Sequence, residues 1–261
     1  MAKESKCVFG TRRMEYLGHV ITKEGVATDP HKVEAILHWP IPTTIKQLRS
    51  FLRLTGYYRK FVKGYGAICR PLTQLLQKDS FVWTDTTTMA FKQLKHAMSQ
   101  PPVLALPNFD KTFVVETDAS GVGIGAVLMQ EGHPIAFVSK GLGPWQLALS
   151  TYERKLLAIV YAVAKWKHYL WGRWFLIITD HSSLKFLLDQ KTTHVAQQVW
   201  LTKLLGFDYE IEYRRGKDNL VADAISRVSH NELCALTLYS ISTNIMGKLW
   251  RPGKLIRTCD S

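Results

Sequence analysis

The chain has 261 residues, enough for one large domain or two small ones with cores of ordinary size. Its 46% hydrophobic content is that of a globular protein and excludes a chain that is disordered as a whole. The sequence has 34 basic and 21 acidic residues, which give a formal net charge of +13. This excess favours a polyanionic partner such as nucleic acid, with a merely basic protein as the alternative.

Three helical runs are predicted in the first hundred residues. The first candidate, 31–38, is broken by Trp39-Pro40-Ile41-Pro42, after which Thr44 is a candidate N-cap for a helix from Ile45 to Tyr58. One face of that helix is apolar, and the other carries the basic residues Lys46, Arg49, Arg53 and Arg59. A third helix is predicted over 87–98 and ends before Pro101-Pro102, which we interpret as the domain boundary.

Beyond the two prolines the pattern predicts a mixed sheet covered by helices. Strands at 112–117, 126–129 and 135–138, with glycines 121, 123 and 125 in turns, predict an antiparallel meander. A helix is then expected over 150–170, and the remaining elements alternate. They are a strand at 175–178, helices at 183–188 and 197–205, a strand at 209–213 and a helix after Asn219. The fold class is therefore α/β with mixed α+β character.

Three aspartates occur where these elements end or begin. Asp118 is predicted at the end of the first strand, Asp180 directly after the strand at 175–178, and Asp223 at the start of the last helix. Taken singly, each is better interpreted as a turn residue, a helix cap or a partner of the helix dipole. Only the ordered set, together with the surrounding motifs, favours a metal site.

Those motifs resemble the reverse transcriptase and ribonuclease H segment of gypsy-type long-terminal-repeat retrotransposon polyproteins, of the plant kind. They span about residues 6 to 227 in the order and spacing of that family. The matching stretches are Glu15-Tyr16-Leu17-Gly18-His19-Val20, Trp39-Pro40-Ile41-Pro42, Leu48-Arg49-Ser50-Phe51-Leu52, Gly56-Tyr57-Tyr58-Arg59-Lys60-Phe61, Glu116-Thr117-Asp118-Ala119-Ser120, Trp166-Lys167-His168-Tyr169-Leu170, Thr179-Asp180-His181 and Ala222-Asp223-Ala224-Ile225-Ser226-Arg227.

The resemblance implies a domain division. Residues 1–38 would be the end of the reverse transcriptase palm and 39–100 a thumb- or connection-like helical module. Residues 108–228 would be a ribonuclease H-like domain with a five-stranded mixed sheet, and 229–261 a tail whose folding stays open. The polymerase of the family uses paired aspartates, and this chain has no Asp-Asp dipeptide. It is expected to begin after that palm hairpin and to lack an integrase, so a missing palm subunit is one conceivable partner.

The resemblance also implies magnesium-dependent endonucleolytic cleavage of RNA in RNA–DNA hybrids, with Mg²⁺ as the cofactor. Asp118 would bridge two metal ions, Asp180 would share one of them, and Asp223 would hold the other more loosely. The family has a glutamate on the helix between the first two sites, where this chain has Lys155.

Lys155 changes the expected chemistry. An ammonium in place of a carboxylate is a change of two charge units, which lowers metal affinity, and it can pair with Asp118 or Asp180. Glu153 is a poor substitute, because two positions along a helix rotate a side chain by about 200°. We therefore predict a folded but catalytically crippled site, with Lys155 as a built-in counter-ion. The alternative is a nuclease-dead nucleic-acid-binding remnant, and a third is a pseudogene product that never accumulates.

The remaining predictions concern nucleic-acid contacts and packing. Arg49, Arg53, Arg59, Lys60 and Lys63 are candidate phosphate contacts, where Arg53 replaces a glycine usual in the family. Tyr58 and Phe61 are expected in the core, as are Trp166, Trp171, Trp174 and Trp200. His181 is interpreted as structural or substrate-lining.

Cysteine spacing and hydropathy indicate the compartment. The four cysteines, Cys7, Cys69, Cys234 and Cys259, are scattered, which favours reduced thiols in an intracellular protein. Neither a signal peptide nor an apolar stretch of about 20 residues is present, so no membrane partner is expected.

Overall fold

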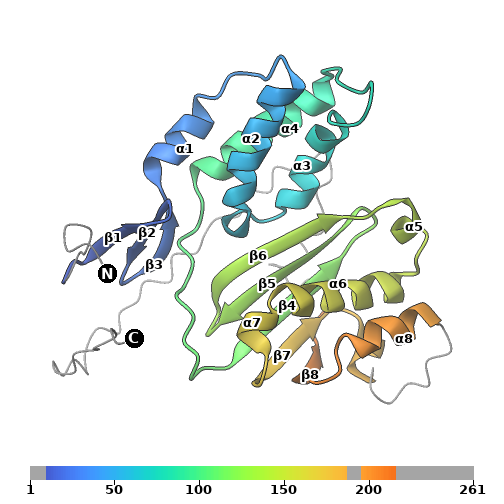
Figure 1. The fold of residues 1–261 in the computed structure, drawn as a ribbon. Helices are drawn as coiled ribbons and strands as arrows, with labels where there is room; N and C mark the ends of the chain where they lie inside the picture. The colour runs from blue at the N-terminus through green and yellow to red at the C-terminus, as the bar shows by residue number, and fades with distance from the viewer. Residues whose placement is uncertain (1–9, 187–194, 216–261) are drawn as a thin grey trace, which may run out of the picture. The chain divides into compact units, whose positions relative to one another are not determined.

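The computed structural model describes residues 10–186 and 195–215 (Figure 1). A small N-terminal sheet, which the sequence analysis did not anticipate, contains β1 (Arg13–Tyr16), β2 (His19–Thr22) and β3 (Gly25–Thr28) in antiparallel order. Its edge pairs with a residue beyond the two prolines, because the Val26 amide donates to the Leu104 carbonyl at 2.8 Å. Gly25 is required there, since a Cβ would lie 2.1 Å from the Leu104 oxygen and its φ is +139°.

Four helices and one 3-10 turn follow this sheet. They are α1 (Pro30–Leu37), α2 (Ile45–Tyr57), η2 (Arg59–Phe61), α3 (Tyr65–Gln74) and α4 (Asp85–Ser99). The predicted cap of α2 is confirmed, because the Thr44 side chain accepts from the Gln47 amide. Helix α4 begins two residues earlier than predicted, since Thr84 and Thr87 form a capping box.

The main sheet has five strands in the order β6-β5-β4-β7-β8. Its strands are β4 (Phe113–Ala119), β5 (Gly123–Gln130), β6 (His133–Gly141), β7 (Trp174–Thr179) and β8 (Asp208–Tyr213). The first three form the predicted antiparallel meander, whereas β7 runs parallel to both β4 and β8. The predicted α/β fold with a mixed five-stranded sheet is thereby confirmed.

Two of the predicted turn glycines lie inside a strand instead. Gly123 pairs with Gly141 and Gly125 with Asp118, so β5 starts at Gly123 rather than at Ala126. A Cβ at Gly123 would lie 3.2 Å from the Lys140 carbonyl oxygen, which explains a glycine in this closely packed strand.

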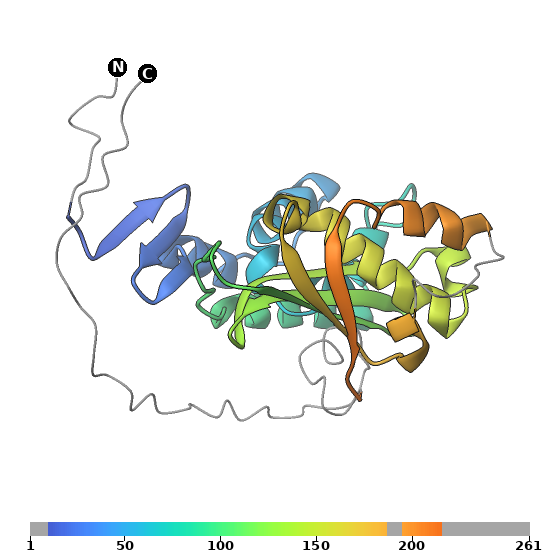
Figure 2. The same ribbon diagram turned by 90° about the horizontal axis from the view of Figure 1, so that it is seen from below.

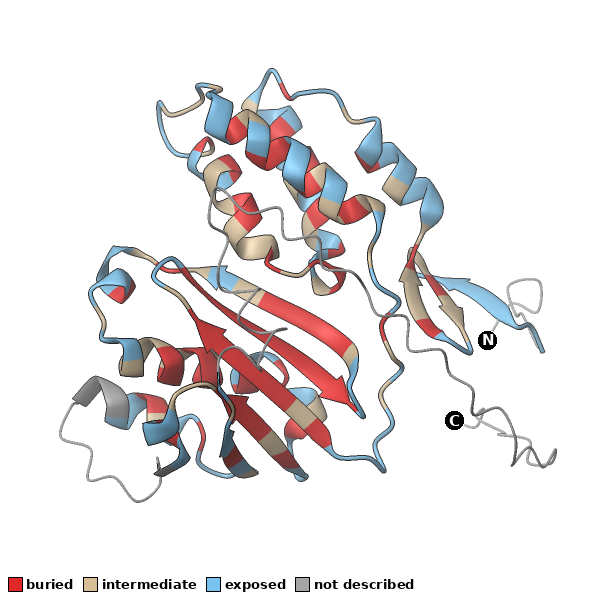
Figure 3. Cartoon of the chain, turned by 180° about the vertical axis from the view of Figure 1, so that it is seen from behind, coloured by how far each residue is buried: buried red, intermediate tan, exposed pale blue. Residues whose placement is uncertain are grey.

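Helices cover both faces of the sheet. One face packs against α6 (Thr151–Lys165) and α8 (Val195–Thr202), which lie side by side in Figure 2. The other face, at β5 and β6, shares a core with α2, α3 and α4 through Val127, Met129 and Phe137. Figure 3 shows buried residues running along the central strands while the outer helix turns are exposed. The shorter elements are α5 (Pro144–Leu147), α7 (Lys167–Leu170) and η3 (Ser182–Phe186). The helix predicted over 183–188 coincides with η3 as far as Phe186, and its last two residues lie outside the described residues.

In the part of the chain that the structure describes, no helix is both long enough and apolar enough to cross a membrane.

Candidate functional site

Two of the predicted aspartates meet at one edge of the sheet. Strands β4 and β7 are parallel neighbours, so their carboxyl ends lie together, and Asp180 follows β7 directly. Strand β4 runs two residues beyond the predicted Thr117, so Asp118 lies within the strand and pairs with Gly125. The third aspartate, Asp223, lies outside the described residues.

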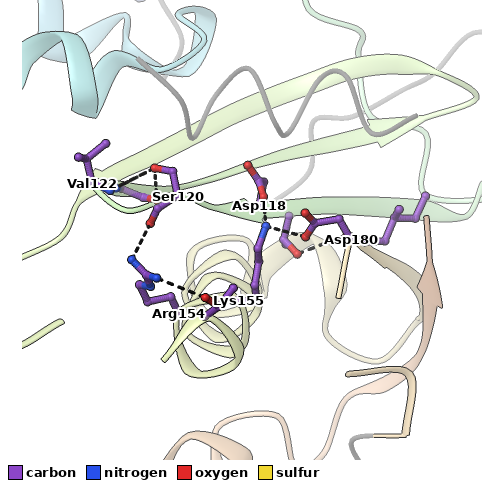
Figure 4. Close-up of polar contacts among 10 residues, drawn as sticks. Asp118, Ser120, Val122, Arg154, Lys155 and Asp180 are labelled. Atoms are coloured by element: carbon purple, nitrogen blue, oxygen red, sulfur yellow. Dashed lines mark hydrogen bonds and ion pairs between the residues drawn. The ribbon is translucent and has the colours of Figure 1, made fainter. Parts of the chain in front are cut away.

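Lys155 reaches this edge from the second turn of α6 and lies between the two carboxylates (Figure 4). Its Nζ contacts Asp118 Oδ1 and lies 2.6 Å from Asp180 Oδ1. The exposed fractions of the Lys155, Asp118 and Asp180 side chains are 7%, 2% and 16%. The ammonium therefore offsets one of the two negative charges of carboxylates that are largely withdrawn from water.

Helix α6 begins in a way that keeps Glu153 away from this cluster. The Ser150 side chain accepts from the Glu153 amide, and Glu153 Oε2 accepts from the Ser150 amide at 2.9 Å and from its hydroxyl at 2.8 Å. This capping box satisfies the first turn of the helix. Glu153 is thereby engaged at the helix start, as its position two residues from Lys155 predicts.

A second ion pair lies on the same face of β4. Glu116 is two residues before Asp118, so both side chains point the same way. Glu116 Oε1 accepts from Arg214 Nη1 at 2.9 Å, and Arg214 also donates its amide to the Thr179 carbonyl from the end of β8. The sequence analysis missed this pair; the alternation along β4 was the available signal for Glu116, whereas nothing local pointed to Arg214.

Burial and these cations act in opposite directions on the carboxyl groups. Burial raises the pKa of Asp118 above its ordinary value, and the Lys155 ammonium offsets part of that rise. Burial likewise raises the pKa of Glu116, with Arg214 and Lys63 opposing it. Each buried carboxylate on this edge is thus compensated by a cation of the chain itself.

Arg154 is another residue that the sequence analysis did not single out. Its guanidinium donates to the Ser120 carbonyl and to the Thr151 hydroxyl, both at 3.4 Å (Figure 4). Ser120 in turn organises the turn after β4, since its hydroxyl accepts from the amides of Val122 and Gly123. Arg154 therefore ties the start of α6 to the loop that follows Asp118.

The described residues do not fit a divalent magnesium ion at this edge. Magnesium requires several hard oxygen ligands in octahedral geometry. Here a cation of the protein contacts both carboxylates, and among residues 10–186 and 195–215 no group of three or more His, Cys, Asp and Glu side chains could hold a metal ion.

His181 follows Asp180 and lies against α6. Its ring packs edge-on against Tyr152 at a centroid distance of 5.5 Å, and its Nδ1 is buried without a hydrogen-bond partner among the described residues. This placement is compatible with both roles predicted for it.

The candidate phosphate contacts lie on α2 and around η2, and among them Lys63 is close enough to Glu116 to oppose the rise that burial causes in the pKa of that carboxyl group. Arg49, Arg53 and Arg59 are exposed, whereas Lys60 and Lys63 are partly buried. Their contacts with nucleic acid stay predictions. The predicted burial of Tyr58 and Phe61 is confirmed, with exposed fractions of 1% and 0%.

The prediction that four tryptophans belong to the core is half right. Trp166 and Trp200 are buried, but Trp171 and Trp174 are 55% and 44% exposed. Both exposed residues flank the turn before β7, where Lys167 lies over the Trp171 ring at 4.7 Å. The Trp171 ring therefore contacts the Lys167 ammonium at the surface and does not enter the hydrophobic core.

Comparison with known proteins relates this arrangement to polyproteins of mobile elements. The family described as "RNase H-like domain found in reverse transcriptase" matches residues 83–177. The retrovirus-related Pol polyproteins from transposons 297 and gypsy of Drosophila melanogaster are 44% and 38% identical to this chain over 87% and 88% of its length. The Tf2-3 transposon polyprotein of Schizosaccharomyces pombe is 34% identical over 86% of it. The chain spans only 22%, 24% and 18% of these three relatives.

Solved structures show the same fold. One is a foamy viral protease-reverse transcriptase in complex with double-stranded DNA, with a TM-score of 0.70 and 22% sequence identity. The match covers 77% of this chain and 38% of the viral chain. Another is a foamy viral protease-reverse transcriptase in complex with an RNA/DNA hybrid, with a TM-score of 0.68 and 20% sequence identity. This match covers 94% of this chain and 32% of the viral chain.

Proposed function

Because the chain belongs with the gypsy-class retrovirus-related Pol polyproteins and contains their reverse transcriptase RNase H-like domain, we propose that it binds RNA–DNA hybrids through a ribonuclease H centre silenced by Lys155. The observation that carries the proposal is the Lys155 ammonium between Asp118 and Asp180. A glutamate there would add to the negative charge of the two aspartates, whereas the lysine offsets half of it. Hydrolysis that depends on a metal held by these carboxylates is accordingly impaired.

The basic surface supports the nucleic-acid part of the proposal. Residues 1–100 carry 16 Lys and Arg against 7 Asp and Glu, an excess of nine positive charges, so a polyanion is attracted to the helical module. We propose Arg49, Arg53, Arg59, Lys60 and Lys63 as phosphate contacts. We also propose the division into a palm end, a thumb-like module and an RNase H-like domain at the boundaries predicted from the sequence. No polymerase activity is proposed, since the chain has no Asp-Asp dipeptide.

The test is magnesium-dependent cleavage of a labelled RNA–DNA hybrid by the unaltered chain and by Lys155→Glu. The expected result is cleavage by Lys155→Glu alone, since that change restores a carboxylate to the cluster. Lys92→Glu, with the same change of charge at an exposed position of α4 away from the carboxylates, is the matched control and should stay inactive. Cleavage by the unaltered chain would refute the silencing role of Lys155.

Thermal unfolding gives a second readout that does not require turnover. The melting temperature of the unaltered chain should not respond to magnesium, because the Lys155 ammonium already occupies the space between the two carboxylates. Lys155→Glu should melt lower in chelator and rise with added magnesium, as expected for a ligand that binds the folded state. Marked stabilisation of the unaltered chain by magnesium would contradict the proposal.

A second candidate function is nucleic-acid binding without any nuclease. The ion pair between Glu116 and Arg214, in addition to those of Lys155, favours it, because all three carboxylates are then paired with cations of the chain. If neither the unaltered chain nor Lys155→Glu cleaves the hybrid while both still bind it, the binding remnant is the correct interpretation.

A further inference from the structure

A cavity of about 290 Å³ lies where the helical module meets the main sheet, away from the carboxylates. From the helical module it is lined by Tyr57, Arg59, Lys60 and Tyr65, and from α6 by Tyr161 and Lys165, with β6 between them. Lys165 is ten residues after Lys155 on the same helix, which corresponds to about 15 Å along its axis. We call this cavity the α6–η2 groove.

Direct contacts hold the two walls of the groove together. The Gly66 amide, at the start of α3, donates to Ser139 Oγ on β6 at 2.7 Å. A Cβ on Gly66 would lie 2.9 Å from the Ser139 backbone, so the helical module approaches the strand as closely as a glycine permits. The hydroxyls of Thr55 and Tyr65 are 3.0 Å apart, which fixes the Tyr65 ring in its wall. The groove is therefore a preformed feature.

The charge of the groove is positive on both sides. Its described lining contains Arg59, Lys60 and Lys165 and no carboxylate. Arg59 lies close enough to Tyr161 to oppose the rise in the pKa of that phenol that burial causes. Burial also lowers the pKa of Lys60, whose ammonium lies 5.1 Å from the centroid of the Phe61 ring. Cations from two walls thus face one space without a compensating anion of the lining.

The rings of the lining indicate what kind of anion fits. Tyr57 is 50% exposed, and one side of its ring is stacked on His19, with centroids 5.3 Å apart and planes 8° apart. Tyr58 meets the same ring edge-on at a centroid distance of 5.0 Å, so a base would lie against the exposed part of Tyr57. Tyr57 also borders a second hollow lined by Ser50, Arg53 and Leu54, so cations continue past it along α2. Alternating rings and cations are typical of surfaces that stack unpaired bases and grip their phosphates.

We propose that the α6–η2 groove binds single-stranded nucleic acid, with a base against Tyr57 and phosphates on Arg59, Lys60 and Lys165. A double helix keeps its bases stacked inside and is far larger than a cavity of about 290 Å³, so a duplex could contact only the rim. The groove deepens the proposed function and rests on it only for the choice of nucleic acid as the polyanion. It requires neither metal nor the carboxylates.

The test is fluorescence anisotropy in the presence of a chelator, with three labelled probes of about twelve nucleotides. They are a single strand, an abasic single strand of the same charge, and an RNA–DNA hybrid. Lys165→Gln should reduce the salt dependence of single-strand binding by about 0.7 in the slope of log K against log salt. Lys92→Gln on α4, an exposed lysine outside the groove lining, is the matched control and should leave the slope unchanged.

The base contact is tested at Tyr57. Both Tyr57→Phe and Tyr57→Leu remove the hydroxyl, which donates to the Leu17 carbonyl, but only the first keeps an aromatic ring. Tyr57→Leu should bind the single strand about fivefold or more weakly than Tyr57→Phe, and the two should bind the abasic strand alike.

Two results would overturn the groove as a single-strand site. One is equal slopes for Lys165→Gln and Lys92→Gln, and the other is hybrid binding that exceeds single-strand binding and weakens with the same substitutions. Neither depends on cleavage, so failure of the groove is distinguishable from failure of the Lys155 account, which is decided by Lys155→Glu on the hybrid.

Discussion

The two ends of α6 carry the same residue type in opposite environments. Lys155, near the start, is 7% exposed and contacts two carboxylates, whereas Lys165, at the end, is exposed and lines a groove whose described lining has no carboxylate. Lys155 is paired with carboxylates inside the protein, whereas Lys165 is available to bind a ligand. Surroundings, rather than residue type, decide whether a cation stabilises the fold or binds a partner.

The largest effect that separates the two ends is expected on stability. Lys155→Met should lower the free energy of unfolding by about 3–5 kcal/mol, because it leaves Asp118 and Asp180 buried without their counter-ion. Lys165→Met should change it by no more than about 0.5 kcal/mol. Urea denaturation of both variants measures the difference.

Combining two substitutions isolates the ion pair itself. Adding Asp118→Asn to Lys155→Met removes one of the two uncompensated charges, so the double variant should recover part of the lost stability. Equal destabilisation by Lys155→Met and Lys165→Met would show that the two ends do not differ in this way.

An intermediate effect is expected where the walls of the groove meet. Gly66→Ala should cost about 1–3 kcal/mol, because the added methyl group overlaps the Ser139 backbone. It should also weaken single-strand binding by moving the walls apart. Gly56→Ala within α2 is the control, since its Cβ would meet only Tyr65 Oη at 3.5 Å.

The two glycine variants should change the free energy of unfolding in opposite directions. Alanine has the higher helix propensity, so Gly56→Ala should stabilise by up to about 1 kcal/mol. Thermal unfolding and the single-strand assay report both variants, and a Gly66→Ala protein as stable as Gly56→Ala would disprove the close contact with Ser139.

The smallest effect is expected at the start of α6. Ser150→Ala should cost about 1 kcal/mol, because the Glu153 amide loses its acceptor, whereas Ser150→Thr should retain most of the cap. In Ser150→Ala, the rate of amide hydrogen exchange should increase in the first turn of α6 and stay unchanged in the turn that carries Lys165. Equal loosening of both turns would mean that the helix responds as a whole and that its ends are not independent.

Much of the local structure could be predicted because its causes lie close together in the sequence. Thr44 beside Ile45 fixes the start of α2, and Ser150 with Glu153 fixes that of α6, through hydrogen bonds that span three residues. Beyond Pro101-Pro102 the order of strands and helices followed from hydrophobic periodicity, which each segment carries by itself, whereas the sheet of β1 to β3 and helix α3 were missed. Lys155 in place of a carboxylate was likewise visible in the sequence.

What only the tertiary structure decided depends on pairs far apart in the chain. Parallel pairing of β4 with β7 places Asp180 beside Asp118, and the end of β8 carries Arg214 across to Glu116, 98 residues away. The same holds for the groove, since Lys165 and Arg59 line one cavity only because the helical module packs on β5 and β6. No local pattern records such contacts: periodicity and capping report on neighbours within a few residues, while burial and charge pairing are set by the packing of whole elements.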